Sequence, residues 1–291
     1  MSVYTGRIIK GIGGFYYVDT ADGVFECRAR GVMRQKKITP LVGDIVEITV
    51  DDNLKTGAVE RIEPRRNELI RPSVSNIDIM AVVAATANPR PNLYLLDKLI
   101  ASAENMDITP LICFNKTDVD SGEELAEIYE KSGFDVLRLS AETGQNIELL
   151  KDKLKDKTTV FAGNSGVGKS SLLNMLFGEE IFETGQVSDR VERGKHTTRH
   201  SELKRLPFGG YIIDTPGFGS FDITLLEIDD LSSLFRDIEP FSYECRFRDC
   251  SHTVEAGCSV LQALRNGKIE QSRHENYCKL VQEIRDAQKW K

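Results

Sequence analysis

The sequence predicts an α/β protein in which a mostly parallel sheet is packed between helices, with a small β-barrel before it and a helical module after it. Three observations support this prediction. Short strand-like segments separated by turn residues fill residues 1–64. From residue 77, continuous apolar segments alternate with helical segments. Near the C-terminus, three cysteines and a histidine lie close together in a region whose pattern is otherwise helical.

Length and composition are those of an ordinary globular protein of two or three domains. The chain has 291 residues, of which 40% are hydrophobic and 29% are charged. Its longest apolar segment, residues 79–87, is much shorter than the roughly 20 residues of a membrane-spanning helix, so we expect no membrane association. The first residues lack the pattern of a secretion signal. We therefore expect a cytoplasmic protein, and nothing in the sequence calls for more than a monomer.

The net charge of −7 is distributed unevenly along the chain. Residues 1–64 are neutral, residues 240–291 carry +2, and the region between them carries −9. Two stretches, 28–37 and 190–205, are strongly basic. Each has the composition of a solvated surface loop, but the acidic total does not exclude a polyanionic partner for the basic parts.

Residues 1–64 are predicted to form the β-barrel. Five strand-like segments lie at residues 5–10, 15–19, 24–30, 45–49 and 58–62. Five short strands suit an oligonucleotide-binding (OB) barrel, and an SH3-like barrel fits nearly as well, because periodicity does not separate the two. The polar segment 65–76, which contains Pro72, is expected to be a linker.

Residues 77–224 are predicted to form the α/β domain, and residues 225–291 the helical module. The expected strands of the α/β domain are 77–85, 110–114, 136–140, 159–163 and 211–214, and its expected helices are 93–105, 123–132, 148–155 and 169–177. Strands with continuous apolar sequence are typical of a sheet that is buried on both faces. In the module, helices are expected at 225–237, 259–266 and 271–288.

A phosphate-binding loop follows the expected strand 159–163 and precedes a helix. It matches the pattern G-x-x-x-x-G-K-[ST] and consists of Gly163, Asn164, Ser165, Gly166, Val167, Gly168, Lys169 and Ser170, with Ser171 next in the helix. The glycines let backbone N–H groups point at a phosphate. Lys169 supplies a charge for the β- and γ-phosphates, and the Ser170 hydroxyl is suited to Mg²⁺.

Two further motifs indicate which nucleotide binds, and both follow expected strands. Asn115, Lys116, Thr117 and Asp118 form an N-K-x-D motif, and Ser140 and Ala141 begin a second loop. The Asp118 carboxylate can pair with the two donors on guanine that adenine lacks, so ATP would leave a buried carboxylate unpaired. A backbone N–H at 140–141 can meet the guanine O6. These residues predict GTP or GDP as the ligand.

A fourth motif, Asp214-Thr215-Pro216-Gly217, follows the expected strand 211–214. Asp214 is placed to hold Mg²⁺ through water, and the Gly217 N–H to approach the γ-phosphate. Each short motif is common by chance, and an aspartate in a turn is the ordinary alternative. All four, however, lie at the carboxyl ends of strands, where open α/β sheets bind their ligands.

The order of these motifs predicts a circular permutation. The base-reading motifs precede the phosphate loop and Asp214, whereas an ordinary small GTPase has the phosphate loop first. Domain termini often lie close together, which makes such a rearrangement physically possible. The switch segments then lead directly into the C-terminal module.

The cysteine–histidine cluster predicts a zinc site. Its members are Cys245, Cys250, His252 and Cys258. Three thiolates and one imidazole complete a tetrahedral set with no open position, which is typical of a structural Zn²⁺ site, and soft ligands select Zn²⁺ over Mg²⁺. A loop with buried free cysteines is the alternative. His274 and Cys278 are expected to take no part.

With these motifs, nearly the whole chain resembles the circularly permuted GTPases of the small ribosomal subunit biogenesis GTPase A family. The resemblance implies a GTPase that binds the immature small ribosomal subunit and its rRNA, assists late maturation, and is released by subunit-stimulated hydrolysis. Residues 194–199 resemble the family's first switch, with Lys195 in place of an arginine. In this segment, Thr197 or Thr198 is expected to reach Mg²⁺ and the γ-phosphate.

The residue after Gly217 is Phe218. Familiar GTPases have a water-orienting glutamine at this position or at the next one. We therefore expect slow intrinsic hydrolysis. We expect His196 to supply the missing group when a partner orders the switch. The alternative is that His196 only contacts the partner's phosphates. Two rival functions remain: a GTP-gated RNA-binding scaffold, which Phe218 favours, and a switch with a protein partner.

Overall fold

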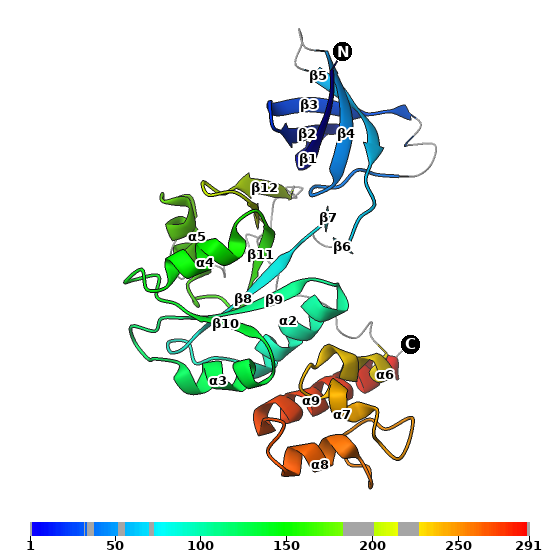
Figure 1. Ribbon diagram of the computed structural model, residues 1–291, viewed down its shortest axis with the longest axis vertical. Coiled ribbons are helices and arrows are strands. Elements are labelled where there is room, and N and C mark those ends of the chain that lie inside the picture. Colours follow the sequence, from blue (N-terminus) through cyan, green and yellow to red (C-terminus); the bar gives the residue numbers. More distant parts are fainter. Residues whose placement is uncertain are drawn as a thin grey trace.

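The computed structural model describes residues 2–31, 33, 38–51, 56–69, 73–182, 201–214 and 227–289. Figure 1 shows three parts in sequence: the barrel, the α/β domain, and a helical module that contains the C-terminus. Within the described residues, no helix is both long enough and apolar enough to cross a membrane.

The barrel closes through five strands, which are β1 (Ser2–Ile12), β2 (Phe15–Thr20), β3 (Gly23–Ala29), β4 (Ile45–Asp51) and β5 (Thr56–Ile62). The strand order is β1-β2-β3-β5-β4, and β4 pairs back onto β1. β3 and β5 run parallel, and the other neighbours are antiparallel. This closed strand order, with a parallel β3–β5 pair, is that of an OB barrel. Of the two barrels predicted, the structure therefore has the OB barrel and not the SH3-like barrel. Alternating residues such as Ile8, Val18 and Ile48 fill its interior.

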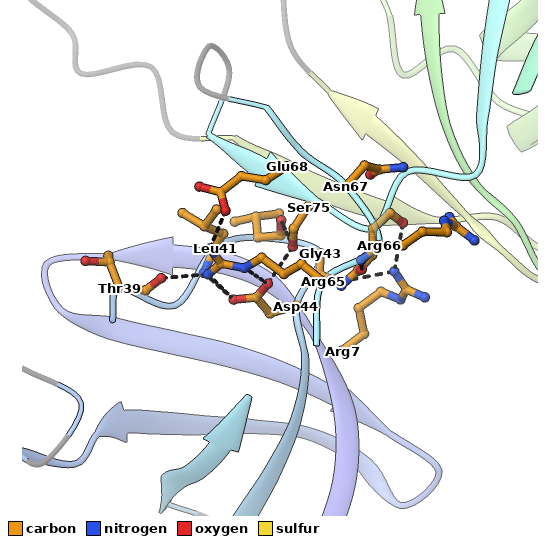
Figure 2. Close-up of polar contacts among 12 residues, drawn as sticks. Arg7, Thr39, Leu41, Gly43, Asp44, Arg65, Arg66, Asn67, Glu68 and Ser75 are labelled. Atoms are coloured by element: carbon orange, nitrogen blue, oxygen red, sulfur yellow. Dashed lines mark hydrogen bonds and ion pairs between the residues drawn. The ribbon is translucent and has the colours of Figure 1, made fainter. Parts of the chain in front are cut away.

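The expected linker, 65–76, contains a short ribbon made of β6 (Glu68–Leu69) and β7 (Val74–Ser75). A fully buried carboxylate, Asp44, fixes this ribbon to the barrel (Figure 2). Arg65 donates to Asp44 through Nε at 2.7 Å and through Nη2 at 2.8 Å, and the Ser75 hydroxyl donates to it at 2.6 Å. The barrel side of the connection is therefore held by a saturated, buried carboxylate.

The same ribbon is fixed to the α/β domain at its other side. Asn67 donates to the carbonyl of Ile77 at 2.8 Å and accepts the Ile77 N–H at 2.8 Å. Arg66 donates to the Ile77 carbonyl at 2.7 Å and forms an ion pair with Asp78 at 2.9 Å. The connection between the two domains is thus an ordered joint and not a free tether.

The sheet of the α/β domain has the order β10-β9-β8-β11-β13-β12. Its strands are β8 (Ile79–Ala85), β9 (Thr109–Asn115), β10 (Asp135–Arg138), β11 (Thr158–Ala162), β12 (Glu202–Arg205) and β13 (Tyr211–Asp214). All neighbours are parallel except β12, which pairs antiparallel with β13. The sequence did not predict β12, because Glu202, Lys204 and Arg205 give it the charged pattern of an exposed edge.

Two pairs of helices cover the sheet, one on each face. α2 (Leu93–Asn105) and α3 (Glu123–Lys131) share an apolar core with Met80, Val82 and Ile112. α4 (Ile147–Leu154) and α5 (Lys169–Phe177) share a second core with the alternate strand residues, among them Ala81 and Val83. The continuous apolar strands therefore do bury both faces, as predicted.

The C-terminal module consists of α6 (Ile228–Leu231), a 3₁₀ turn (Ser232–Leu234), α7 (Glu239–Ser242), α8 (Ser259–Arg265) and α9 (Gln271–Gln288). The expected helix 225–237 is wrong in its described part, where α6 and the 3₁₀ turn replace one continuous helix. The apolar core of the C-terminal module includes Ala101 of α2. The module therefore packs on the helix that covers β8 and β9.

Candidate nucleotide and metal sites

The four predicted nucleotide motifs follow β9, β10, β11 and β13. These strands are parallel, so their carboxyl ends lie along one edge of the sheet. Asn115 ends β9, the 140–141 loop follows β10, the phosphate loop follows β11, and Asp214 ends β13. Of the predicted residues, His196, Thr197, Thr198 and Gly217 lie outside the described part of the chain, as do Lys195 and Phe218.

The phosphate loop needs glycine at both of its ends. Gly163 has φ +138°, and a Cβ there would lie 2.1 Å from the carbonyl oxygen of Val83. Gly168 has φ +95°, and a Cβ there would lie 2.2 Å from Nδ2 of Asn115. At these two positions the loop therefore passes too close to its neighbours for a side chain, and its backbone can line a phosphate there.

Lys169 begins α5 and reaches back over the loop. Its Nζ donates to the carbonyls of Gly163 at 2.9 Å and Asn164 at 2.6 Å. Burial lowers the pKa of Lys169, because removal from water disfavours the ammonium. Ser170 and Ser171 are half-buried in the first turn of α5, next to its N-terminal N–H groups. This set of donors fits a polyphosphate, whose negative charge would favour the lysine ammonium.

Asn115 holds two of the loops together. It is buried, with 1% exposure. Its Nδ2 donates to the carbonyl of Val167 at 2.9 Å, and its Oδ1 accepts the Ala141 N–H at 3.0 Å. One amide thus sets the distance between the phosphate loop and the expected base-reading loop.

Asp118 is exposed, and Ser140 orients it. The Ser140 hydroxyl donates to Asp118 Oδ1 at 2.5 Å and accepts the Thr143 N–H at 3.1 Å. Thr117 donates to the Leu139 carbonyl at 2.9 Å, which fixes the N-K-x-D segment to the end of β10. Ser140 therefore supports the carboxylate, a role that the sequence did not show.

The four predicted metal ligands lie together in the C-terminal module. The ligand atoms of Cys245, Cys250, His252 and Cys258 all lie within 4.8 Å of one another. His252 Nδ1 lies 3.4 Å from Cys245 Sγ and 3.6 Å from Cys258 Sγ, and these two sulfurs are 3.8 Å apart. Tetrahedral Zn–S bonds of about 2.3 Å place sulfurs about 3.8 Å apart, so the cluster has the size that zinc requires.

A carboxylate orders the loop that carries these ligands. Glu255 accepts the N–H groups of Ser251 and Thr253 at 2.9 Å and of Val254 at 3.0 Å, and it accepts the Ser251 hydroxyl at 2.5 Å. Burial raises the pKa of Glu255, but these hydrogen bonds outweigh burial and lower the pKa to about 2. The carboxylate is therefore ionised at neutral pH and saturated with donors.

His274 also supports the ligand loop, although it is not a ligand. It is buried on α9, and its Nε2–H donates to the carbonyl of His252 at 2.8 Å. This bond holds a backbone that has φ +59° at His252, a conformation uncommon for a non-glycine residue. His274 was expected to take no part in this site, but it supports the backbone of His252.

The chain matches two protein-family models. Residues 62–224 match RsgA GTPase, and residues 5–59 match the RsgA N-terminal domain. Two curated relatives, both described as small ribosomal subunit biogenesis GTPase RsgA, are similar over nearly the whole chain. The relative from Alkaliphilus metalliredigens is 46% identical over 98% of this chain and 99% of its own. The relative from Agathobacter rectalis is 47% identical over 98% of this chain and 100% of its own.

Two solved structures share the fold. One is YloQ, described as a circularly permuted GTPase, with 36% identity and a TM-score of 0.83 over 98% of this chain and 96% of that one. The other is YjeQ from Thermotoga maritima, with 33% identity and a TM-score of 0.84 over 97% of this chain and 99% of that one. The predicted fold class, including the permutation, is confirmed.

Proposed function

Because this chain belongs to the RsgA GTPase family and is a GTPase, we propose that it assists late maturation of the small ribosomal subunit in the cytoplasm. It acts as a monomer that binds the immature subunit and its rRNA with GTP and Mg²⁺ bound. Hydrolysis, stimulated by the subunit, drives its release. The single observation that carries this proposal is the match, over nearly the full length of both chains, with relatives described as small-subunit biogenesis GTPases.

We propose that the base lies against the loops that Asn115 joins. Asp118, oriented by Ser140, pairs with the two guanine donors. The Ala141 N–H, expected to meet O6, donates to Asn115 Oδ1 at 3.0 Å and would have to be shared with the base. Lys116 and Thr117 complete this base-binding segment. GTP and GDP bind equally well to these residues, so discrimination between them depends on the γ-phosphate.

The triphosphate is proposed to lie in the loop 163–171, with Lys169 over the β- and γ-phosphates. The Ser170 hydroxyl and Asp214 are the described residues that would hold Mg²⁺, and Thr197 or Thr198 would join them when GTP is bound. Mg²⁺ there would neutralise charge that develops on the phosphates. Gly217 would contact the γ-phosphate through its N–H.

We propose that a water molecule is oriented by His196 after the subunit has ordered the switch. Phe218 supports this, because an apolar side chain has no group with which to orient water. An RNA phosphate contact is the alternative role for His196. The second candidate function is a GTP-gated scaffold in which hydrolysis is incidental, and Phe218 favours it.

We propose that Zn²⁺ at the three cysteines and His252 has a structural role. All four positions are filled by protein, so the metal orders the module and does not activate water. The sulfur-to-sulfur and sulfur-to-nitrogen distances support this proposal.

An RNA-binding role of the barrel is supported by an exposed arginine on an aromatic ring. The Cζ of Arg28 lies 4.3 Å from the ring centroid of Phe15, and the two residues are cross-strand partners on β2 and β3. Such a pair offers both a planar cation and a ring to a nucleic acid. It lies at the start of the basic stretch 28–37.

The test is GTP turnover by the purified protein, measured alone, with small ribosomal subunits, and with large subunits as the control. Strong stimulation by small subunits only would support the proposal. If nucleotide binds but no subunit stimulates turnover, while binding to the small subunit depends on nucleotide, the scaffold function is correct instead. If neither turnover nor binding responds to the small subunit, both are wrong.

A further inference from the structure

We propose that the barrel positions the switch segments for GTP hydrolysis, with Lys10 and Asp19 as positioning residues that hold the β12–β13 hairpin. If the subunit binds the barrel, the same contacts would transmit that binding to the nucleotide, and this part of the proposal rests on the function proposed above. The positioning itself does not, because it acts on turnover by the protein alone.

The hairpin is the common stem of both switch segments. β12 begins two residues after the segment 183–200, which contains the first switch, and β13 ends at Asp214, where the second switch begins. Glu202 and Asp214 are direct cross-strand partners. A shift of this hairpin therefore moves the end of one switch and the beginning of the other together.

The barrel extends the same sheet onto this stem. Lys10 of β1 pairs with Glu202 of β12, so Lys10, Glu202 and Asp214 lie in one line across three strands. Lys10 Nζ lies 3.1 Å from Glu202 Oε1 and 3.2 Å from Oε2. One cross-strand neighbour thus separates a barrel residue from the residue proposed to hold Mg²⁺.

A second contact holds the other end of the hairpin. Asp19 of β2 is 8% exposed, and it accepts the Tyr211 hydroxyl at 2.7 Å and Arg205 Nη1 at 3.4 Å. Tyr211 begins β13 and Arg205 ends β12. Burial and the bond to Asp19 raise the pKa of Tyr211 to about 12, so the phenol stays a donor at neutral pH.

The position of the barrel is also fixed through Arg7, which links the hairpin contact to the joint at Asp44. Arg7, the cross-strand partner of Asp19, lies with Cζ 5.6 Å from the Tyr211 ring centroid. Its Nη1 donates to the carbonyl of Gly43 at 3.2 Å, beside the joint at Asp44 (Figure 2). Because the joint holds the barrel in place, the contacts of Lys10 and Asp19 can fix the position of the β12–β13 hairpin.

The entry to the first switch lies at the same hairpin. Asn174 accepts the N–H groups of Ile181 and Phe182 at 3.0 and 2.8 Å, which fixes the last described residues before the switch. Lys204 of β12 lies with Nζ 4.4 Å from the Phe182 ring centroid. The last described residue before the segment 183–200 therefore contacts β12, and the barrel pairs with this same strand.

The experiment compares basal GTP turnover of the full chain with that of Tyr211→Phe, Asp19→Ala, their combination, and Asp19→Asn. Tyr211→Phe and Asp19→Ala each remove the same hydrogen bond, so we expect each to lower kcat about three- to tenfold with KM for GTP unchanged. The combined variant should be no worse than Asp19→Ala alone, because the bond to Tyr211 can be lost only once and Asp19→Ala already removes the contact with Arg205. Asp19→Asn keeps an acceptor and should recover most of kcat.

Tyr94→Phe is the matched control. The Tyr94 hydroxyl donates to Glu283 between α2 and α9, so it removes a bond of the same chemistry at the other domain interface. Its basal kcat should equal that of the unmodified chain. Melting temperatures are measured in parallel, since a merely structural role would lower the melting temperature without changing kcat of the folded protein.

The proposal is overturned if Tyr211→Phe and Asp19→Ala keep the basal kcat, or if Tyr94→Phe lowers it equally. Small subunits are then added to each variant. If the unmodified chain shows no stimulation, the proposed function fails, while the basal comparison still decides the positioning role. If small subunits stimulate the unmodified chain, the fold-stimulation of each variant is compared. A larger loss of stimulation in the two hairpin variants than in Tyr94→Phe supports transmission of subunit binding through the hairpin. An equal loss overturns the transmission.

Discussion

Arg273 of α9 and Asp97 of α2 form an ion pair that is almost completely removed from solvent. Arg273 Nη1 lies 2.6 Å from Asp97 Oδ1, and the two side chains are 1% and 0% exposed. Arg273 also donates to Asp237 at 2.8 and 3.1 Å, and Asn276 donates to the second oxygen of Asp97 at 2.7 Å. One buried arginine thus joins the C-terminal module to α2, which covers one face of the α/β sheet.

Replacement of Arg273 by methionine should strongly destabilise the protein. The substitution leaves two buried carboxylates without their cation, which typically costs about 3–5 kcal/mol in the free energy of unfolding. Urea denaturation followed by circular dichroism measures the change. Lys153→Met is the control, because its pair with Asp135 is exposed and contributes about 0–1 kcal/mol. Equal effects of the two substitutions would show that Arg273 does not hold the interface.

Gly168→Ala should reduce nucleotide affinity more than it reduces stability. The new Cβ would lie 2.2 Å from the Asn115 amide, which must then release the carbonyl of Val167 or the N–H of Ala141. We expect GDP and GTP affinities to fall by the same factor, on the order of tenfold or more. Fluorescent-nucleotide titration measures both.

Gly178→Ala, at the other end of α5, is the control that separates the effect of backbone strain from the effect of a steric clash. Gly178 has φ +75°, and a Cβ there has no atom within 4 Å. This control should cost about 1 kcal/mol of stability through its left-handed conformation and leave nucleotide affinity unchanged. If Gly168→Ala binds nucleotide as the unmodified chain does, the Asn115 bridge is not needed to shape the loop.

Asp118→Asn should change the base that the protein prefers. The amide replaces one acceptor with a donor, so guanine loses a partner for its N–H groups while xanthine, with a carbonyl at C2, gains one. We expect GDP affinity to fall by about 100-fold or more and xanthosine diphosphate to bind better than GDP. Calorimetric titration with both nucleotides checks this. Asp120→Asn, two residues along the same loop, should leave the preference for guanine intact.

Glu255→Ala should weaken zinc binding although Glu255 is not a ligand. Without the carboxylate, three backbone N–H groups lose the acceptor that shapes the loop between Cys250 and Cys258. We expect zinc affinity to fall about 10- to 100-fold, measured by competition with a coloured chelator. Glu275→Ala, on α9, removes the same charge away from the loop and should keep its zinc. Retention of full affinity by Glu255→Ala would contradict the supporting role.

The features that could be predicted from the sequence are those that depend on the residues of a single segment, such as one helix or one motif. The expected helices 93–105 and 271–288 coincide with α2 and α9, because their apolar periodicity reports burial directly. The candidate phosphate loop and the candidate metal ligands could be proposed from the sequence because their chemistry fixes spacing along the chain. Such patterns identify the residues of a site, but not what supports them.

The contacts between distant segments could not be predicted in this way. Lys10 and Glu202 are separated by 192 positions, and both have the sequence character of surface charges. Arg273 lies in a helix of low mean hydropathy, and its burial depends on Asp97 and Asp237 from two other elements. Periodicity describes the exposure of one segment and carries no information about the partner that neutralises a buried charge.

His196→Ala tests the group that orients the attacking water. Because Phe218 has no polar atom, and the glutamine of other GTPases is missing at this place, loss of His196 should remove stimulated turnover almost completely. GTP affinity should change less than about twofold, since the base and phosphate loops are intact. Turnover with saturating small subunits gives the first quantity and nucleotide titration the second. His200→Ala, in the same basic stretch, controls for loss of a phosphate contact: if both variants lose subunit affinity but keep the turnover of the bound state, His196 binds RNA and another group orients the water.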